Sequence, residues 1–382
     1  MGVCFFGTYA KGEGYPVNSV LLKGLSQAGV EVEELHEPLW GEFLHRAFSK
    51  TGLWGLIGLG GRIARAYWRL ARRYRGMAPH QVVLVGYPGY FDVWLARLLN
   101  WRRRRLVVLV AFISLYDTAV GDRGTVRPGS LKAGLLRRID RWAFTRADLV
   151  LVDTAAHATH YADLLQVPAA KFMRSYVGQD EAHFRPRPPA AGGGAKDTLD
   201  VLFFGTYVPL HGIDTILEAA RILRDEADIT LTLVGNGQLY DAMRARAAEG
   251  ALDNVRFVDR WMTADELEAR IGEADICLGI FGTTAKAARV IPYKVFGALA
   301  MRKPLVTRDS PAVRELLRDG RDALLCSPGS ADELAAALRR LRDDPSLAAR
   351  LAEAGHRRYL QCGTPRAIGA ELWGHLEGRL AG

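Results

Sequence analysis

Three cationic side chains fall within nine residues in the second half of the chain. Lys286, Arg289 and Lys294 follow the apolar run Ile276–Ile280, which predicts a buried strand. Pro292 is placed to start a helix, so Lys294 would lie in its first turn, where a cation is unfavourable unless an anionic ligand compensates. Arg grips a diphosphate in bidentate fashion and Lys acts as a point charge, so the cluster predicts a diphosphate site. A solvated surface loop is the alternative.

Glycine turns follow three predicted strands of the same half. They are Gly205–Gly212 (GTYVPLHG), Gly235–Gly237 (GNG) and Phe281–Thr284 (FGTT). Glycine at a strand-to-helix turn lets backbone N–H groups approach an anion, which the dipole of the next helix also attracts. A plain strand–helix connection explains each turn taken singly. The GNG turn also lacks the third glycine and the acidic residue of a dinucleotide fingerprint.

The sequence Val-x-Phe-Phe-Gly-Thr-Tyr occurs twice, opening at Val3 and at Val201. Each copy is a short apolar run that ends on a glycine, which is typical of a buried parallel strand leading into a loop. Ligands of open parallel sheets bind outside the carboxyl ends of the strands. The repeat therefore predicts two similar α/β domains, with the two Gly-Thr-Tyr turns at a cleft between them.

Strands that alternate with helices must position these residues. In the first half we expect strands at Val3–Phe6, Val30–Leu35, Gln81–Gly86, Leu106–Phe112 and Leu149–Val152, and helices at Val17–Ala28, Asp92–Asn100 and Leu135–Thr145. In the second half we expect strands at Leu199–Phe204, Ile229–Val234, Val255–Val258, Ile276–Ile280 and Leu305–Thr307, and helices at Ile213–Glu226, Leu239–Glu249, Ala264–Gly272, Tyr293–Ala300, Pro311–Arg318 and Ala331–Asp343. This alternation predicts two Rossmann-like α/β domains with parallel sheets.

The Pro-, Gly- and Ala-rich stretch Arg185–Thr198 predicts a linker between the domains. The expected domains are residues 1–190 and 198–360. A last helix within residues 365–382 is expected to cross back to the first domain.

The segment IPYKVFGALAMRKPLVT, from Ile291 to Thr307, resembles the donor-site signature of family-four retaining glycosyltransferases of the GT-B fold. Four other segments are similar to that family in order and spacing: VGQDEAHFRP, GTYVPLHGIDTILEAA, TLVGNGQ and VRFVDRWMTADELEARIGEADICLGIF. The resemblance covers most of residues 130–360, whereas the first 130 match in layout only. It implies transfer of a sugar from a nucleotide-diphosphate donor to an acceptor hydroxyl, with retention of the anomeric configuration.

Carried over by position, the resemblance implies roles for the second half. Lys286, Arg289 and Lys294 would hold the diphosphate, because Thr206 and His211 occupy places where many members have Arg and Lys. The other implied donor-binding residues are Gly205, Gly212, Gly235 beside the nucleotide, Arg260 and Trp261 beside the base, Phe281, Gly282 and Thr283 along the sugar, and Pro292 and Val295. Arg289 and Gly297 replace the family's paired glutamates, so the glutamate contact to the ribose is missing; close helix packing is the alternative role for Gly297.

The net charge of +9 comes from the first half of the chain. Residues 1–190 carry 26 Lys and Arg against 15 Asp and Glu, and the remainder carries 25 against 27. Within residues 51–76 the basic residues are Arg62, Arg65, Arg69, Arg72, Arg73 and Arg75, among Leu53, Trp54, Ile57, Tyr67, Trp68 and Leu70. Arginines at three- and four-residue steps beside aromatic residues indicate an anionic membrane surface as a partner. Trp101-Arg-Arg-Arg-Arg105 adds a second cluster. Solvated helices are the alternative, and no recognised motif favours nucleic acid.

On the acceptor side we expect Gly7, Thr8, Tyr9, Tyr116 and Asp117. Asp117 follows the strand Leu106–Phe112 and could orient or deprotonate an acceptor hydroxyl; capping of the next turn is the alternative. We expect a glycan, a lipid-linked sugar or a small molecule as the acceptor.

No cofactor and no metal ion are expected, because no His/Cys cluster is present. The four cysteines are scattered, and neither a signal peptide nor a membrane span is visible, so we expect a cytoplasmic protein that can associate with the inner face of the membrane. A non-catalytic sugar-nucleotide-binding or scaffold protein remains the second hypothesis, since the glutamates are missing. A nucleotide-dependent oxidoreductase is the third, and the incomplete fingerprint disfavours it.

Overall fold

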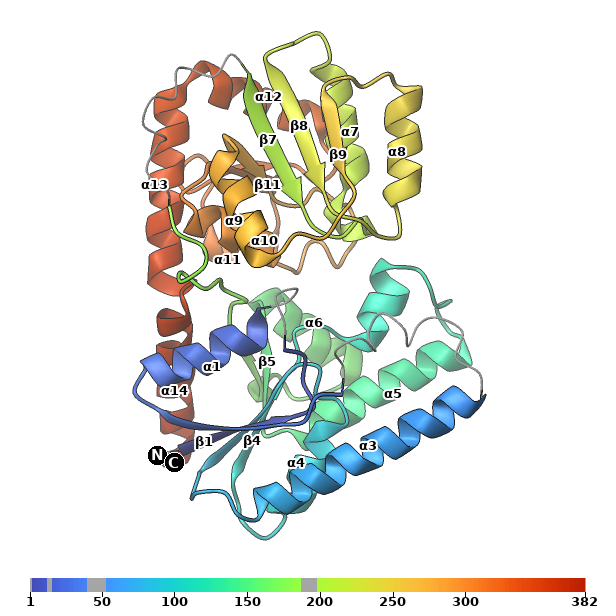
Figure 1. Cartoon of the computed structure of the whole chain (residues 1–382), viewed down its shortest axis with the longest axis vertical. Coiled ribbons are helices and arrows are strands. Elements are labelled where there is room, and N and C mark those ends of the chain that lie inside the picture. The colour runs from blue at the N-terminus through green and yellow to red at the C-terminus, as the bar shows by residue number, and fades with distance from the viewer. Residues whose placement is uncertain (1, 12–15, 40–52, 187–197, 382) are drawn as a thin grey trace. The chain divides into compact units, whose positions relative to one another are not determined.

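The chain forms two compact α/β units in the computed structural model, which describes residues 2–11, 16–39, 53–186 and 198–381 (Figure 1). Unit 1 comprises Met1–Thr118, Val126–Tyr176 and Pro365–Gly382, and unit 2 comprises Ala119–Thr125 and Val177–Thr364. Most of the predicted linker, residues 187–197, lies outside the described residues. So do the side chains of Leu53, Trp54 and Ile57.

Unit 1 contains a six-stranded parallel sheet in the order β2-β1-β3-β4-β5-β6. Its strands are β1 (Gly2–Gly7), β2 (Glu31–His36), β3 (Val82–Val85), β4 (Leu106–Val110), β5 (Leu149–Val152) and β6 (Phe172–Arg174). Its helices are α1 (Val17–Gln27), α3 (Leu53–Tyr74), α4 (Asp92–Asn100), α5 (Leu131–Arg146), α6 (Ala155–Leu165) and α14 (Pro365–Ala381). Strands β1, β3 and β5 are buried along their whole length, which is why they are apolar without alternation.

Unit 2 contains a second six-stranded parallel sheet in the order β12-β11-β10-β7-β8-β9. Its strands are β7 (Leu199–Phe204), β8 (Ile229–Val234), β9 (Val255–Val258), β10 (Ile276–Leu278), β11 (Leu305–Arg308) and β12 (Leu324–Cys326). Its helices are α7 (Ile213–Ile222), α8 (Tyr240–Glu249), α9 (Ala264–Glu273), α10 (Tyr293–Ala300), α11 (Pro311–Leu316), α12 (Ala331–Asp343) and α13 (Pro345–Cys362). The prediction of two α/β parts with parallel sheets is confirmed.

The strand order reverses at one place in each sheet. In unit 2 the chain runs outward from β7 through β8 to β9, and then continues on the other side of β7 with β10. In unit 1 the reversal lies between β1 and β3. Open parallel sheets bind ligands outside the carboxyl ends of the strands at such a reversal. The two Gly-Thr-Tyr turns follow β1 and β7, so each lies at the reversal of its own sheet.

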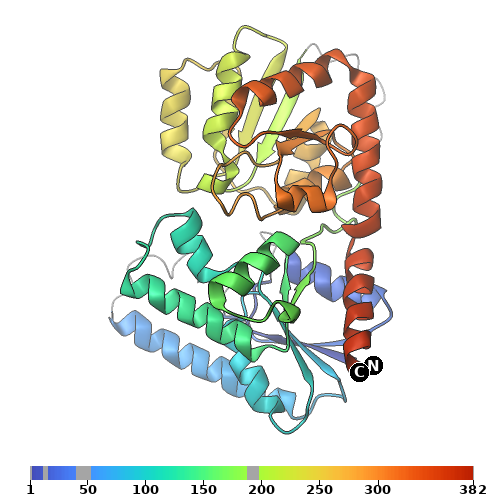
Figure 2. The same ribbon diagram turned by 180° about the vertical axis from the view of Figure 1, so that it is seen from behind.

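Helix α14 packs along α1 in unit 1, although all of α7 to α13 lies between them in the sequence (Figure 2). Two glycines allow their backbones to meet. A Cβ atom on Gly24 would lie 2.2 Å from the carbonyl oxygen of Pro365, and one on Gly369 would lie 2.0 Å from the carbonyl carbon of Gly24. The first unit is therefore completed by the segment that follows the second.

Candidate functional site

The glycine turns of unit 2 approach one another so closely that side chains would not fit. Gly205, Gly212 and Gly235 have positive φ angles of 139°, 64° and 128°. A Cβ on Gly235 would lie 2.1 Å from the oxygen of Gly205, and one on Gly212 would lie 2.3 Å from the nitrogen of Gly282. The turns after β7, β8 and β10 thus form one bare backbone surface beyond the carboxyl ends of the strands.

Lys294 carries the most unusual side chain of this region. It lies in the first turn of α10 after Pro292, and it is 1% exposed. Its Nζ atom lies 3.9 Å from the centre of the Phe203 ring and has no hydrogen-bond partner among the described residues. Burial without a counter-charge holds the pKa of Lys294 well below its ordinary value. A buried amine that has no hydrogen-bond partner can pair with an anion that enters the site from solvent.

The side chains of His211 and Lys294 both lie close to Gly205. A Cβ on Gly205 would lie 2.9 Å from Nζ of Lys294 and 3.5 Å from Cε1 of His211. The Nδ1 atom of His211 is hydrogen-bonded to the carbonyl oxygen of Thr206, so it must carry the proton. Burial and the nearby Lys294 hold the pKa of His211 well below its ordinary value, so the ring is neutral. Neither Thr206 nor His211 supplies positive charge here.

Lys286 and Arg289 lie in the connection that joins β10 to α10. Lys286 is 5% exposed and Arg289 is half-buried. The segment is held by backbone hydrogen bonds, 2.9 Å from the nitrogen of Arg289 to the oxygen of Lys286 and 3.3 Å from the nitrogen of Ala312 to the oxygen of Ala288. All three predicted phosphate-binding cations therefore belong to one ordered stretch of chain.

The other predicted donor residues differ in exposure. Phe281 and Val295 are fully buried, whereas Thr283 is exposed. Trp261 is 60% exposed, and Arg260 beside it forms an ion pair of 2.7 Å with Glu266. Gly282 accepts a hydrogen bond from the guanidinium of Arg308, a buried residue that the sequence analysis missed. A charged residue at the end of the apolar run Leu305–Thr307 was the available signal.

Gly297, at the place of the second family glutamate, lies within α10. A Cβ there would be 3.5 Å from Phe204 and 3.8 Å from Ile271, which is ordinary van der Waals contact. Packing alone therefore does not require glycine at this position.

The first Gly-Thr-Tyr turn is built around Asp92, which the sequence analysis missed. Asp92 accepts hydrogen bonds from the backbone nitrogen of Thr8 at 2.7 Å and from its hydroxyl at 3.0 Å, and Tyr67 also bonds to it. A Cβ on Gly7 would lie 2.5 Å from the same carboxylate. Burial raises the pKa of Asp92 to about 6. A lone acid in the otherwise apolar start of α4 was the signal in the sequence.

The tyrosines of both turns are buried. Tyr9 packs edge-on against Phe5 at 4.8 Å, and its hydroxyl bonds to Glu34. Tyr207 packs edge-on against Phe203 at 6.2 Å. Thr8 and Tyr9 are each 1% exposed, so any contact of this turn with an acceptor would come from its backbone.

Asp117 opens the π-helix η1 (Asp117–Asp122) and lies 3.3 Å from Nε2 of His160. Its backbone nitrogen donates to Ser114, whose hydroxyl donates to Asp140 at 2.7 Å. Asp140 also accepts from the backbone nitrogen of Tyr116 at 2.9 Å, and burial raises its pKa to about 6. The buried carboxylate of Asp140 thus fixes the segment that carries Tyr116 and Asp117.

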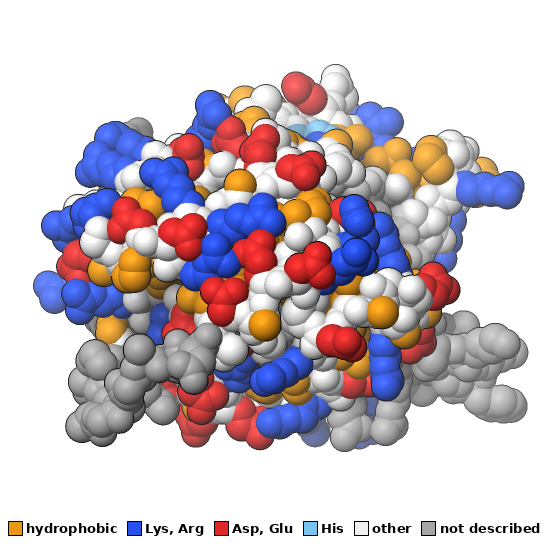
Figure 3. All heavy atoms as spheres, turned by 90° about the horizontal axis from the view of Figure 1, so that it is seen from above, with side chains coloured by type: hydrophobic (Ala, Val, Ile, Leu, Met, Phe, Trp, Pro, Cys, Tyr) orange, Lys and Arg blue, Asp and Glu red, His pale blue; other side chains and the backbone are white. Residues whose placement is uncertain are grey.

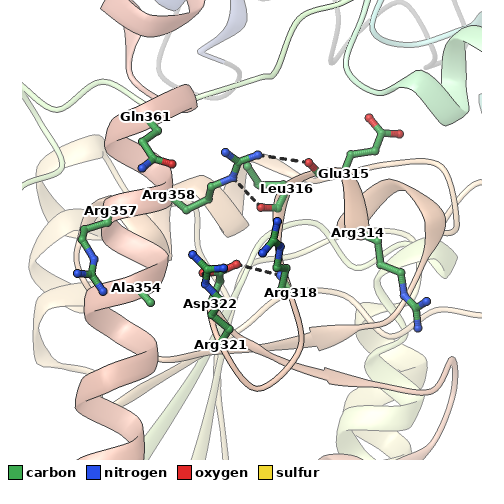
Figure 4. Close-up of a pocket in the computed structure, with 10 residues that line it drawn as sticks. All are labelled: Arg314, Glu315, Leu316, Arg318, Arg321, Asp322, Ala354, Arg357, Arg358 and Gln361. Atoms are coloured by element: carbon green, nitrogen blue, oxygen red, sulfur yellow. Dashed lines mark hydrogen bonds and ion pairs between the residues drawn. The ribbon is translucent and has the colours of Figure 1, made fainter.

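A separate concavity of about 510 Å³ lies in unit 2 beside α13 (Figure 4). Arg358 donates to the carbonyl oxygen of Leu316 at 2.9 Å, while Arg318 and Arg357 come from opposite walls. None of the predicted donor or acceptor residues lines it. Across the described parts of the chain, no group of three or more His, Cys, Asp or Glu residues could hold a metal ion. In the same residues no helix is both long and apolar enough to cross a bilayer.

Two family descriptions match successive parts of the chain. Residues 14–176 match the glycosyl transferase 4-like domain, and residues 198–344 match the glycosyl transferases of group 1. Together they cover most of the residues of both units, without β1, α13 and α14. The chain belongs to the family-four type of glycosyltransferases with the GT-B fold.

Relatives and solved structures agree with this family. The alpha-D-kanosaminyltransferase of Streptomyces kanamyceticus is 26% identical over 227 residues, which are 56% of this chain and 56% of the relative. The glycogen synthase of Mycobacterium tuberculosis H37Rv is 27% identical over 231 residues, which are 58% and 51%. The matched stretches thus span about half the length of these curated relatives.

Crystal structures support the fold over nearly the whole chain. Sucrose-phosphate synthase of Thermosynechococcus elongatus has a TM-score of 0.71 at 16% identity, covering 99% of this chain and 98% of the other. Anabaena HepE in complex with UDP has a TM-score of 0.68 at 16% identity, covering 99% and 100%.

Proposed function

We propose that this protein transfers a sugar from a nucleotide-diphosphate donor to an acceptor hydroxyl, using the carboxyl end of the unit 2 sheet as the donor site. The observation that carries the proposal is the buried Nζ of Lys294, which has no hydrogen-bond partner among the described residues and lies against Gly205 at the strand-order reversal. Anion binding would supply its missing partner. The similarity to HepE, whose crystal structure contains UDP, supports a nucleotide diphosphate as that anion.

Transfer with retention is the mechanism that we propose for this site. The bond between the sugar carbon C1 and the diphosphate oxygen breaks, and a bond from C1 to the acceptor oxygen forms on the same face. The acceptor proton passes to the departing phosphate oxygen. Lys286, Arg289 and Lys294 would neutralise the charge that develops on that oxygen, which is the main contribution required of the protein. Asp117 would orient the acceptor hydroxyl.

The acceptor that we propose is presented at a membrane surface, as a lipid-linked sugar would be. The positive charge of residues 1–190 and the arginines of α3 support this choice. The protein would then work at the cytoplasmic face of the membrane.

Arg289→Ala tests the assignment, with Arg340→Ala on the exposed side of α12 as a charge-matched control. A thermal-shift screen over UDP-, GDP- and dTDP-sugars first identifies the donor. Donor turnover by Arg289→Ala should then fall roughly 100- to 1,000-fold, because one electrostatic contact to the developing charge is lost. Arg340→Ala should match the parent. Full donor affinity and rate in Arg289→Ala, Lys286→Ala and Lys294→Ala would overturn the site, and donor binding without any turnover in the parent would favour the scaffold hypothesis.

A further inference from the structure

Large hydrophobic side chains are exposed mainly on one part of unit 1. Among the residues described, nine such side chains are exposed, and seven of them belong to α3, α4 and α5 or to the residues that flank α4. The seven are Trp68, Phe91, Trp94, Leu98, Trp101, Leu131 and Leu135. Soluble proteins seldom gather such side chains without a partner.

The exposed residues of α4 follow helical spacing. Phe91, Trp94, Leu98 and Trp101 recur at steps of three, four and three residues, so they form one stripe along the helix. Their exposed fractions are 51%, 44%, 51% and 71%. The opposite side of α4, with Val93 and Ala96, is buried in the core. This helix is therefore apolar on both sides, and only the inner side packs in the core.

The stripe continues onto α5. A groove of about 370 Å³ is lined by Phe91 from the start of α4 and by Arg138, Ile139 and Trp142 from α5. Leu131 and Leu135 extend the α5 side toward its first turn. Figures 1 and 2 both show α3, α4 and α5 as neighbours in unit 1. We call the exposed residues of these three helices, together with Phe91, Trp101 and Arg102 beside α4, the aromatic–arginine face.

The charges that the three helices contribute to the aromatic–arginine face have one sign, although Glu37 and Asp148 from neighbouring segments pair with Arg69, Arg73 and Arg97. The three helices contain eleven Lys and Arg, namely Arg62, Arg65, Arg69, Arg72, Arg73, Arg97, Lys132, Arg137, Arg138, Arg141 and Arg146. They contain only two acids, Asp92 and Asp140, and both are buried. Two tryptophans are paired with arginines, Arg72 at 5.6 Å from the ring of Trp68 and Arg102 at 4.4 Å from that of Trp101. On the face that Figure 3 shows, by contrast, acidic and basic side chains are interspersed.

We infer that the aromatic–arginine face docks on the headgroup region of a bilayer that contains anionic lipids. Tryptophan prefers the boundary between headgroups and acyl chains, and arginine binds lipid phosphate there while its stem stays apolar. A protein partner would need a large acidic and apolar surface, whereas a bilayer supplies both properties at once. This inference deepens the proposed membrane-presented acceptor and rests on it, since it names the surface that would bring unit 1 to that acceptor.

Vesicle co-sedimentation of the full chain tests the docking. We expect binding to phosphatidylcholine vesicles that contain phosphatidylglycerol, and at least fivefold weaker binding to vesicles of phosphatidylcholine alone. Leu98→Glu and Leu360→Glu form a matched pair, because both leucines are 51% exposed and Leu360 lies on α13 of unit 2. Leu98→Glu should weaken binding at least fivefold, and Leu360→Glu should leave it unchanged. Arg65→Gln should weaken it about fivefold, which corresponds to the contribution of one arginine near an anionic surface.

Absence of binding, or equal losses in both leucine variants, would overturn the inference. A parent that elutes as a dimer while Leu98→Glu elutes as a monomer would also overturn it, because the face would then join two copies of the chain. The thermal shift with nucleotide sugars is measured on each variant as a check of folding. If the parent protein binds donor but not vesicles, only the docking proposal is contradicted. If it binds vesicles but no donor, the proposed donor site is contradicted.

Discussion

The position of the Lys294 amine decides how easily this side chain carries a positive charge in the candidate donor site. A lysine on the surface would keep its charge in water at little cost. Here the amine lies between Phe203 and Gly205, beside the neutral ring of His211. An anion that binds beside the amine would favour its charged form, so donor binding and protonation of this side chain are linked.

Replacing Lys294 with Met should stabilise the protein in the absence of donor. The folded-state pKa of Lys294 is below its unfolded value, so the unfolded chain binds more protons. The resulting penalty is fully present below the folded pKa and disappears as the pH rises toward the unfolded value of about 10.4. We expect Lys294→Met to raise the free energy of unfolding by roughly 1–3 kcal/mol at neutral pH, and by less near pH 10. Urea unfolding of both proteins at the two pH values measures the difference; a gap that does not narrow would contradict the buried amine.

At the scale of elements, the site depends on turns that bring three strand ends together. Gly205, Gly235 and Gly282 place backbone where side chains would otherwise lie. The same principle leaves room for the buried ring of Tyr9, because a Cβ on Gly86 would lie 2.6 Å from that ring.

Gly235→Ala should disrupt this arrangement, whereas Gly250→Ala should not. The first substitution strains a positive φ angle and puts a Cβ 2.1 Å from the oxygen of Gly205. We expect a loss of roughly 2–4 kcal/mol in the free energy of unfolding, together with weaker donor binding. Gly250 is the C-cap that follows α8, and a Cβ there would lie 3.4 Å from its nearest neighbours. Chemical unfolding and the nucleotide-sugar thermal shift compare the two variants, and equal behaviour would show that the turns tolerate side chains.

The sequence predicted the longer strands of both sheets and the glycine turns that follow β7, β8 and β10, but it did not predict helices α6 and α13. It failed for β6 and β12, which are three residues each and exist because a neighbouring strand pairs with them. It also placed a cation in the first turn of α10 but gave no sign that Lys294 is buried. That property depends on Phe203 and Gly205, which come from a distant strand. A local sequence pattern indicates the periodicity of a helix, but it does not indicate which residues its side chains contact in the folded protein.

At the scale of the whole molecule, unit 1 is assembled from segments at both ends of the described chain. Gly369→Ala should loosen it, because a Cβ there would lie 2.0 Å from the backbone of Gly24 in α1. Gly374→Ala, five residues further along α14, meets nothing within 4 Å and should be neutral or stabilising by up to about 1 kcal/mol. Hydrogen exchange of the amides in α1 and α14 reads the effect in unit 1 directly. Unchanged protection of these amides from exchange in Gly369→Ala would show that the contact between α1 and α14 tolerates a side chain at this position.

The return of α14 to α1 also sets an order of events during synthesis. The ribosome adds every residue of unit 2 before those of α14, so α14 can pack on α1 only after unit 2 has been synthesised. The surface of α1 that surrounds Gly24 stays uncovered throughout that time. A protein that binds nascent chains would find exposed apolar surface on α1 during that time, and α14 would displace it by packing there.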